Sequence, residues 1–518
     1  MDYKDARKEI KGQNIDGLLS AVGRSKTIQL LQMAFQDKEK PIRVQAINYI
    51  GKIGAVETVG GLVPLLAERD EAIQGSAIEA LTKIGMPSVV SLIWSLETSG
   101  PQREKASVVL TNIGSNIIRE VLEDTKNTNI GSSFHLATFI ELYHPDEEVR
   151  QTGLDLSSEL LSAGVSPLVM KDTANKIYTS LQDKSPEVRE RGAQMIGRMG
   201  VSSDNSIFKL TDLLDDPSVL VQIAAINSLA MFGEARIVSD FGKKAKSKVP
   251  EVRRAVAKAL GKIYNSEAAE LLIFLLLSDE NPAVIETADF SLQRLGEHAI
   301  SPLITSLSKG NPRSAAVLEK IGRSSIPYLI DSLMSKNSNT IQQAQDLLTR
   351  FSEDAIPPLV QKIENQVPPI FLKNAIPLLC RLPGEQPIKI LWSISNDKSE
   401  RKLIAASMRN KVPTAVDCLV KNIEEFEESL IESFSEVLVQ LPTEMTVESL
   451  ILGFSTTPEE YHDRLIALLC SLGDKAILSR LKILTKSKPE EAKALLLALC
   501  GMKEFQKVCN KGKKSLKI

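Results

Sequence analysis

SPEVRERGAQMIGRMG, residues 185–200, begins beside a proline and ends at a glycine. Pro186 suits the first turn of a helix, where its missing N–H costs nothing, and Gly200 is suited to end that helix in a left-handed cap. The apolar residues between them fall at helical spacing: Val188, Met195, Ile196 and Met199. The stretch therefore predicts one short amphipathic helix.

Nearly the same phrase recurs along the chain, as KPIRVQAINYIGKIG (40–54) and VPEVRRAVAKALGKIY (249–264). From Gly200 onward the successive ends are 33, 31, 32, 26 and 30 residues apart. Between Gly114 and Gly200 the spacing stretches around one longer copy, HPDEEVRQTGLDLSSELLSAG (144–164). The ends of the other copies are Gly54, Gly85, Gly114, Gly200, Gly233, Tyr264, Gly296, Gly322 and Ser352. A fixed period of this length indicates a repeat architecture.

A second phrase follows the glycine in several repeats: HAISPLITSL (298–307), SSIPYLIDSL (324–333) and DAIPPLVQKI (354–363). A polar residue, a proline and an aliphatic face describe a second helix. Neither helix can bury its face alone, so neighbouring repeats must stack. Small residues at the middle of the first helices permit close approach: Ala46, Gly192, Ala225 and Ala288.

The two phrases together resemble the HEAT repeat, in particular the short form, about 30 residues long, of the HEAT-like repeats of phycobilisome lyases. The resemblance covers about residues 38–366. It implies an all-α fold, a right-handed α-solenoid of stacked antiparallel helix pairs whose second helices line a concave binding surface. This architecture serves many unrelated tasks, so the resemblance is specific for the fold and not for a function.

In that family an arginine near the start of the first helix and an aspartate in the preceding turn form a ladder between repeats. The arginine position is occupied here by Arg43, Arg103, Arg150, Arg189 and Arg253, with Asp37 and Asp183 as acidic partners. Other residues stand at that position in four repeats: Gln74, Gln222, Ile285 and Ile341. We therefore expect a discontinuous ladder.

Past residue 366 the repeat pattern weakens, and KNAIPLLCRL (373–382) reads as another second-helix phrase. We predict an N-terminal helical cap over 1–37, the repeat array over 38–366, degenerate helical repeats that continue the solenoid over 367–502, and a basic tail over 503–518. A separate helical domain after 366 is the alternative, although no Gly-, Ser- or Pro-rich linker marks its boundary.

The composition argues against several classes of protein. Acidic residues number 65 and basic residues 63, so the net charge gives no sign of nucleic-acid binding. The five cysteines lie after residue 379 without a CxxC pair, which indicates neither a disulfide framework nor a metal site. The longest aliphatic run, LLIFLLL (271–277), is too short to span a membrane. We expect a cytoplasmic chain without membrane insertion.

Catalytic chemistry has little support in the sequence. The four histidines show no metal-ligand spacing, and no phosphate-binding GxxxxGK[ST] loop occurs. A di-iron hydroxylase of the HEAT-like family uses His-Glu pairs, and no His-Glu dipeptide occurs here. His144 precedes acidic residues that suit a helix start better than a metal site. We predict no enzyme activity, no metal and no cofactor.

Two charged stretches remain. The basic cluster, on KKAKSKVPEVRRAVAKALGK (243–262), comprises Lys243, Lys244, Lys246, Lys248, Arg254, Lys258 and Lys262. Arg254, Lys258 and Lys262 are spaced to share one helix face, which phosphates or an acidic protein could contact, although a solvated face is the simpler interpretation. An acidic stripe has the same helical spacing at Glu425, Glu428, Glu432 and Glu436. It too reads as a solvated face.

The predicted function is a non-enzymatic scaffold or adaptor that binds another protein along the concave face. The first alternative is a nucleic-acid-associated solenoid that uses the basic cluster. The second alternative is an accessory subunit of a modifying enzyme, comparable to the lyase-type relatives.

Overall fold

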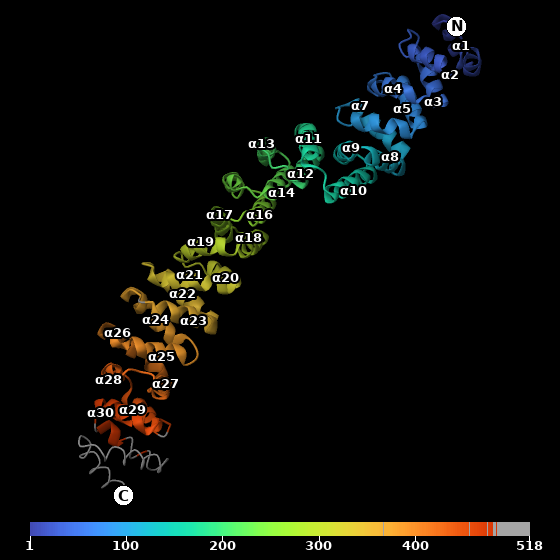
Figure 1. Cartoon of the computed structure of the whole chain (residues 1–518). Helices are drawn as coiled ribbons and strands as arrows, with labels where there is room; N and C mark the ends of the chain where they lie inside the picture. The colour runs from blue at the N-terminus through green and yellow to red at the C-terminus, as the bar shows by residue number, and fades with distance from the viewer. Residues whose placement is uncertain (366, 455, 474, 480–482, 484–518) are drawn as a thin grey trace. The chain divides into compact units, whose positions relative to one another are not determined.

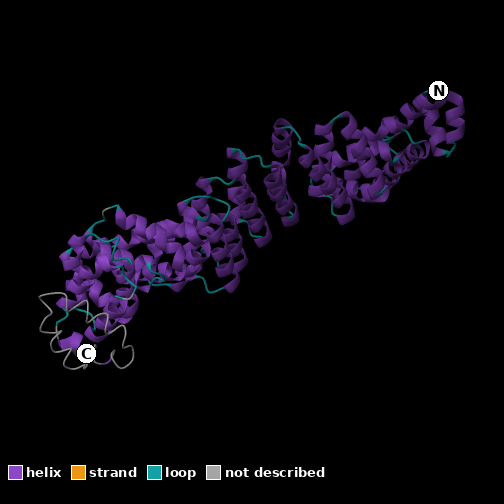
Figure 2. Ribbon diagram, turned by 60° about the horizontal axis from the view of Figure 1, so that its bottom comes forward, coloured by secondary structure: helices purple, strands orange, loops and turns teal. Residues whose placement is uncertain are grey.

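A computed structural model describes residues 1–365, 367–454, 456–473, 475–479 and 483. Within these residues the regular elements are all helices (Figure 2). The chain forms two compact units, Met1–Ile263 and Tyr264–Ile518. In each unit successive helix pairs lie side by side as a solenoid, in agreement with the all-α fold that the sequence predicts (Figure 1).

The first helices of the repeats form one row in each unit. In the first unit they are α3 (Lys40–Ile53), α5 (Glu71–Ile84), α7 (Pro101–Ile113), α12 (Pro186–Met199), α14 (Val219–Phe232) and α16 (Pro250–Leu260). In the second unit they are α18 (Pro282–Leu295), α20 (Pro312–Ile321), α22 (Ser338–Phe351), α24 (Pro369–Arg381), α26 (Lys398–Met408), α28 (Ile431–Leu438) and α30 (His462–Ser471). Neighbours along the second unit's row contact one another from α18 to α30.

The second helices form the other row and are often extended by a 3-10 turn. In the first unit they are α4 (Val59–Leu62), α6 (Val89–Ser95), α8 (Ser115–Thr128), α11 (Pro167–Ile177), α13 (Asp204–Asp212) and α15 (Val238–Lys244). In the second unit they are α17 (Ser266–Ser278), α19 (Glu297–Leu307), α21 (Ile326–Asp331), α23 (Ile356–Glu364), α25 (Gln386–Ser393), α27 (Val412–Lys421) and α29 (Thr443–Gly453). In the second unit, each second helix contacts the next second helix along the row, from α17 to α29.

Three predicted details are wrong. The phrase 373–382 lies in α24, which contacts α22 and α26 and is therefore a first helix. The helix of 249–264 ends at Leu260, so Lys262 lies beyond the helix that carries Arg254 and Lys258. The acidic stripe is not one helix, because a turn and a 3-10 segment (Glu428–Leu430) separate α27 from α28.

The domain boundaries predicted at 37/38 and 366/367 stay predictions. Helices α1 (Tyr3–Lys11) and α2 (Ile15–Ala34) occupy the predicted cap. Residue 366 and the predicted basic tail, 503–518, lie outside the described residues.

An additional helix interrupts the alternation where the sequence spacing stretches. Between α8 and α10 (Glu147–Ala163) lies α9 (Ile130–Tyr143), which contacts α6, α8, α10, α11 and α12. All residues from Ser133 to Tyr143 are buried. A helix surrounded on every side has no polar face, so its sequence shows little amphipathic pattern.

Many of the first helices end at a residue with a positive φ angle. Gly200 (φ 65°, ψ 19°) adopts the left-handed cap that its place in the phrase predicts. Ser352 follows α22 with φ 53° and ψ −119°, almost the backbone of Gly296 (φ 54°, ψ −120°) after α18. A side chain at such an angle is strained, since its Cβ crowds the backbone.

Close approach between first helices depends on a second glycine position. A Cβ added at Gly51 of α3 would lie 2.6 Å from Ala80 Cα on α5, and one at Gly197 of α12 would lie 2.8 Å from Ser228 Cα on α14. Because the obstacle is backbone, these helix pairs would have to separate to admit a methyl group.

The strain at Ser352 predicts that Ser352→Gly stabilises the protein. We expect a gain of about 1 kcal/mol, because removing the strain outweighs the greater freedom of glycine in the unfolded chain. Urea denaturation followed by circular dichroism measures the change. The reverse substitution at the matched site, Gly296→Ser, should cost a similar amount; a loss of stability in Ser352→Gly would contradict the account.

The close contact at Gly51 predicts that Gly51→Ala destabilises the first unit by about 1–3 kcal/mol through overpacking. Gly75, in the middle of α5, has no atom within 4 Å of an added Cβ, so Gly75→Ala is the matched control. It should gain roughly 0.5–1 kcal/mol from helix propensity alone. We expect the urea midpoint to fall in Gly51→Ala and to rise in Gly75→Ala. Equal changes of the midpoint in both variants would show that the contact at Gly51 is unimportant.

Candidate functional site

The predicted ladder residues share one contact in the structure. Their side chains donate to carbonyl oxygens five or six residues earlier, where the preceding helix ends and its carbonyls lack helical partners. Arg189 Nη1 donates to Asp183 O at 2.8 Å and to Lys184 O at 3.1 Å. The equivalent bonds are Arg43 to Asp37 O, Arg103 to Thr98 O, Arg150 to His144 O and Arg253 to Ser247 O.

The ionic part of the ladder is discontinuous. Arg189 forms a two-pronged pair with Asp216 of the next repeat, at 2.7 Å and 2.9 Å. Asp37 accepts from Arg7 of α1, at 2.8 Å, and from the hydroxyl of Tyr3. Asp183 accepts from Arg103, 80 residues earlier, at 2.6 Å. The inserted helix therefore separates two members of the ladder along the sequence.

Where the arginine is missing, other donors serve the same carbonyls or nearby ones. Gln222 donates to Asp216 O at 2.7 Å, and Gln74 donates to Glu68 O and Leu66 O. Isoleucine has no side-chain donor. The helix ends that precede Ile285 and Ile341 accept instead from the first helix of the following repeat: Arg313 donates to Leu276 O, and Asn374 donates to Leu333 O.

Sequence reasoning missed Arg401, a buried member of the same set. It donates to Ser395 O and Asn396 O, six and five residues earlier, and pairs with Glu436 of the next repeat. Its repeat lacks the proline and glycine that mark the other copies. Its position shortly after Asp397, the N-cap of α26, could nevertheless have identified Arg401 as a ladder residue. Asp216 was also missed as an acidic partner.

The basic cluster spans three segments. Lys243 and Lys244 end α15, where cations are favourable beside the helix dipole, and they pair with Asp240 and Asp215. Lys246 and Lys248 lie in the following turn and are exposed. Arg254 and Lys258 are exposed on α16, and Lys262 follows its end. The cluster as a binding surface stays a prediction.

His144 has a structural role. Its ring is buried, with Nε2 3.0 Å from Ser107 O on α7 and Nδ1 accepting from the Asp146 N–H. Burial lowers the pKa of His144, so the neutral ring joins α7 to the start of α10. Asp146 itself caps α10 by accepting from the backbone of Glu148 and Val149. Among the described residues, no group of three or more His, Cys, Asp or Glu side chains could hold a metal ion.

Two of the cysteines are buried. Burial raises the pKa of the Cys380 and Cys418 thiols to about 11, which disfavours the reactive thiolate at neutral pH. Cys500 and Cys509 lie outside the described residues. In the part of the chain that the structure describes, no single helix is long and apolar enough to cross a membrane; one pair of helices bent by 115°, Glu71–Ile84 and Met86–Ser95, meets the length and composition criteria alone.

The second-helix row of the second unit carries a groove between α17 and α19, with a volume of about 870 Å³. Ile273, Phe274 and Leu277 line it from α17, and Pro302 lines it from α19. Phe274 is 42% exposed, although the neighbouring aliphatic residues Leu272, Ile273 and Leu275 of the same helix are buried. Polar side chains surround this apolar floor: Ser266, Glu270, Ser278, His298, Ser301, Thr305, Ser306, Ser308, Lys309 and Asn311.

Pro302 removes one hydrogen-bond donor from α19. It lies inside α19, where a proline has no N–H to donate to the carbonyl four residues earlier. That carbonyl belongs to His298, which also lines the groove and packs edge-on against Tyr264 with ring centroids 6.0 Å apart. The groove thus combines an exposed aromatic ring, hydroxyl groups and a residue, His298, whose carbonyl Pro302 cannot bond.

Comparisons with known proteins identify the repeats. Residues 27–110, 207–293 and 250–325 match the sequence profile of HEAT repeats. Importin beta crystallised in an ammonium sulfate condition is similar at 10% identity, with 96% of this chain and 84% of that chain covered and a TM-score of 0.29. A Kap95p structure, from work on its binding to RanGDP, is similar at 11% identity over 95% and 88%, with a TM-score of 0.28. No curated protein sequence matches the chain.

The pair between Arg189 and Asp216 predicts a pH-dependent stability. Burial raises the pKa of Asp216, but the guanidinium of Arg189 and the Ser218 N–H outweigh it and leave the pKa below its usual range. A carboxyl with a lowered folded-state pKa stabilises the fold above its unfolded pKa of about 4, and that contribution is lost as the pH falls. Hydrogen exchange of α12 and α14 should therefore accelerate as the pH drops from about 5 towards 2, after correction for intrinsic rates.

Asp216→Asn tests the source of this effect. Breaking a pair whose side chains are 13% and 5% exposed should cost roughly 3 kcal/mol at pH 7 and flatten the acid dependence. Asp155→Asn is the control, because its pair with Arg119 is about half exposed and should contribute at most about 1 kcal/mol. An unchanged acid profile in Asp216→Asn would contradict the assignment.

Proposed function

Because this chain is a HEAT-repeat protein, with matched repeats in both of its units, we propose that it is a non-enzymatic scaffold or adaptor that binds another protein through the second-helix row. The groove between α17 and α19 is the observation that carries the proposal. We further propose a cytoplasmic location, as expected for such an adaptor.

The packing of the repeats explains why the second-helix row is free to bind a partner protein. The inner faces of both helices are used to bury the core, as at Leu272 and Leu303, which are fully buried. The outward faces of the second helices then form a valley between consecutive repeats. In α17 an aromatic ring stands at this outward face, where the corresponding residues of α19 and α21 are Thr305 and Asp331.

A protein partner suits the lining of the groove. Interface centres are rich in aromatic anchors surrounded by polar groups, and Phe274 with its ring of hydroxyl groups has this composition. An apolar side chain of the partner would pack against Phe274, while its backbone N–H groups would donate to the hydroxyl oxygens and to His298 O. Catalysis has less support, because in the described structure no hydrogen bond joins a hydroxyl group of the lining to His298 or Glu270.

The nucleic-acid alternative depends on the basic cluster. Its exposed members are Lys243, Lys246, Lys248, Arg254 and Lys258, and such a set could contact phosphates. Lys243 and Lys244 are partly neutralised by aspartates, which weakens this mode. The accessory-subunit alternative and the finer resemblance to lyase-type repeats stay predictions.

Phe274→Asp tests the groove directly. We expect at least a roughly tenfold lower recovery of the partner protein, because a carboxylate replaces an interface anchor. Partners are captured from native cell extract on the full chain, after nuclease treatment, and quantified by mass spectrometry. Circular dichroism verifies that the variant is folded.

Phe290→Asp is the matched control, since Phe290 is 66% exposed on α18, a first helix. It should leave recovery unchanged. Equal losses in both variants would argue against the groove. Recovery from the unaltered protein that disappears after nuclease treatment would instead favour the nucleic-acid alternative.

A further inference from the structure

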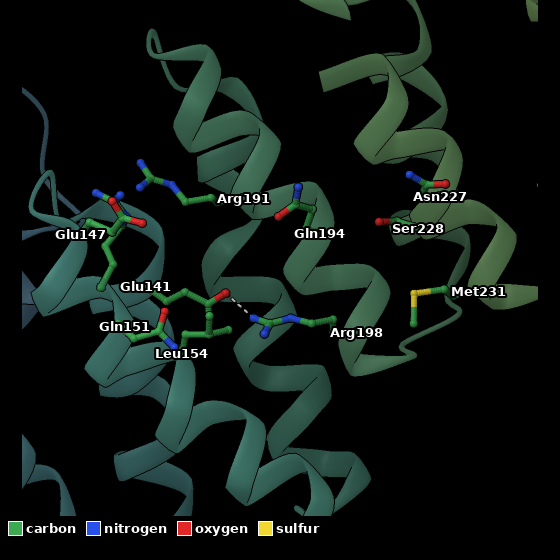
Figure 3. Close-up of a pocket in the computed structure, with 11 residues that line it drawn as sticks. Glu141, Glu147, Gln151, Leu154, Arg191, Gln194, Arg198, Asn227, Ser228 and Met231 are labelled. Carbon is green, nitrogen blue, oxygen red and sulfur yellow. Dashed lines mark hydrogen bonds and ion pairs between the residues drawn. The ribbon is translucent and has the colours of Figure 1, made fainter. Parts of the chain in front are cut away.

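The first unit contains a second cavity, of about 440 Å³, lined by α9, α10, α12 and α14 (Figure 3). Glu141 of α9 and Glu147, Arg150, Gln151 and Leu154 of α10 line one side. Arg191, Gln194 and Arg198 line it from α12, and Asn227, Ser228 and Met231 line it from α14. Neither the basic cluster nor the groove of the second unit contributes to it.

The helical spacing brings these side chains together. Arg191, Gln194 and Arg198 are three and four residues apart, so they project from one face of α12. Figure 3 shows Arg191 extending towards α10, while Arg198 extends towards Glu141. The close contact at Gly197 holds α14 against α12, which places Met231 on the opposite wall.

One ion pair in the cavity is internally satisfied. Arg198 pairs with Glu141, which is 9% exposed, and Ser157 donates to the other carboxylate oxygen at 2.9 Å. Arg198 also donates to Ser158 at 3.3 Å. This pair forms the floor and contributes no net charge.

Two other guanidiniums have no carboxylate partner. Within the described residues, no acidic oxygen lies within 4 Å of Arg150 or Arg191. Arg150 occupies a ladder position, but Asp183, the acid of the following turn, is already bound to Arg103. Arg191 donates through Nε to Glu187 O at 3.2 Å, which leaves its terminal nitrogens available. Desolvation, followed by the nearby charge of Arg150, lowers the pKa of Arg191.

The balance of charge points to the ligand. The negative charges of Glu187 and Glu190, which lie outside the lining, partly offset the charge of Arg191. Among the lining residues, with Glu141 and Arg198 neutralised, two guanidiniums face one carboxylate, Glu147, which leaves one excess positive charge. A single carboxylate would neutralise it, and a guanidinium binds a carboxylate through two parallel hydrogen bonds. A phosphate dianion would add excess negative charge beside Glu141 and Glu147.

We propose that the cavity of α9, α10, α12 and α14 binds the side-chain carboxylate of a glutamate or aspartate in an acidic peptide segment of a protein partner, with Arg191 and Arg150 as its donors. Leu154 and Met231 would contact an aliphatic residue beside the acid. The inference relies on the proposed function only for the partner being a protein, and it concerns a different unit from the groove.

Titration of the full chain with defined peptides tests the proposal. The probes are acetylated, amidated tetrapeptides Gly-Glu-Leu-Gly, Gly-Gln-Leu-Gly and Gly-phosphoserine-Leu-Gly, added to about 10 mM, since a short ligand binds weakly. The readout is the ¹³C-methyl resonance of Met231, which lies in the cavity and is 54% exposed. We expect a saturable shift with the glutamate peptide and at least a roughly fivefold weaker response with the glutamine peptide.

Two charge-matched variants locate the binding. Arg191→Gln should weaken binding of the glutamate peptide at least about fivefold, whereas Arg254→Gln, which removes an exposed charge of the basic cluster, should leave it unchanged. Equal binding of the glutamate and glutamine peptides, no Met231 shift, a preference for phosphoserine, or equal effects of both variants would overturn the proposal. None of these results bears on Phe274, so failure here is distinguishable from failure of the scaffold function.

Discussion

The structure depends on satisfying the carbonyl oxygens at the end of each second helix. Those oxygens have no partner within their helix and lie in a turn too short to expose them all to water. A donor from the following first helix meets this need, as Arg189 does for Asp183 O and Lys184 O. The same side chain thereby connects the end of the second helix to the following first helix. Pairing with an acid such as Asp216 then couples this turn to the following repeat.

The carbonyl contact and the ionic contact are separable. Gln222 makes the carbonyl bond without carrying a charge, and Arg150 makes it without an acid of the next repeat. The reason for the second case lies in α9. Its insertion brings Arg103 to Asp183, so the acid that would serve Arg150 is occupied. An irregularity in the repeat thereby leaves the guanidinium of Arg150 without an ion-pair partner among the described residues, and this guanidinium lines the charged cavity of the first unit.

Local patterns in the sequence were sufficient for the repeats but not for the sites. The phrase that ends at Gly200 predicts both a helix and its left-handed cap, because the signals lie within one turn of the features they specify. Helix α9 gave no such signal, since a helix buried on all sides lacks amphipathic periodicity. The acidic residues from Glu425 to Glu436 had helical spacing, yet a turn divides them, which spacing alone does not reveal. A cavity formed by side chains of neighbouring repeats, such as Phe274 with Pro302, can be predicted only when it is known which helices are adjacent.

Both candidate sites occur where the chain departs from its own repeat. Phe274 replaces the polar residue found at the corresponding positions of α19 and α21, and Pro302 removes an N–H from the middle of a helix. Near the same groove, Ile285 removes the ladder donor, and Arg313 of the following repeat bonds Leu276 O instead. A regular repeat presents the same surface many times and cannot by itself distinguish one partner position from the next. Specific binding in a solenoid therefore requires such exceptions, and the carbonyl contacts allow them because several kinds of donor can complete the same turn.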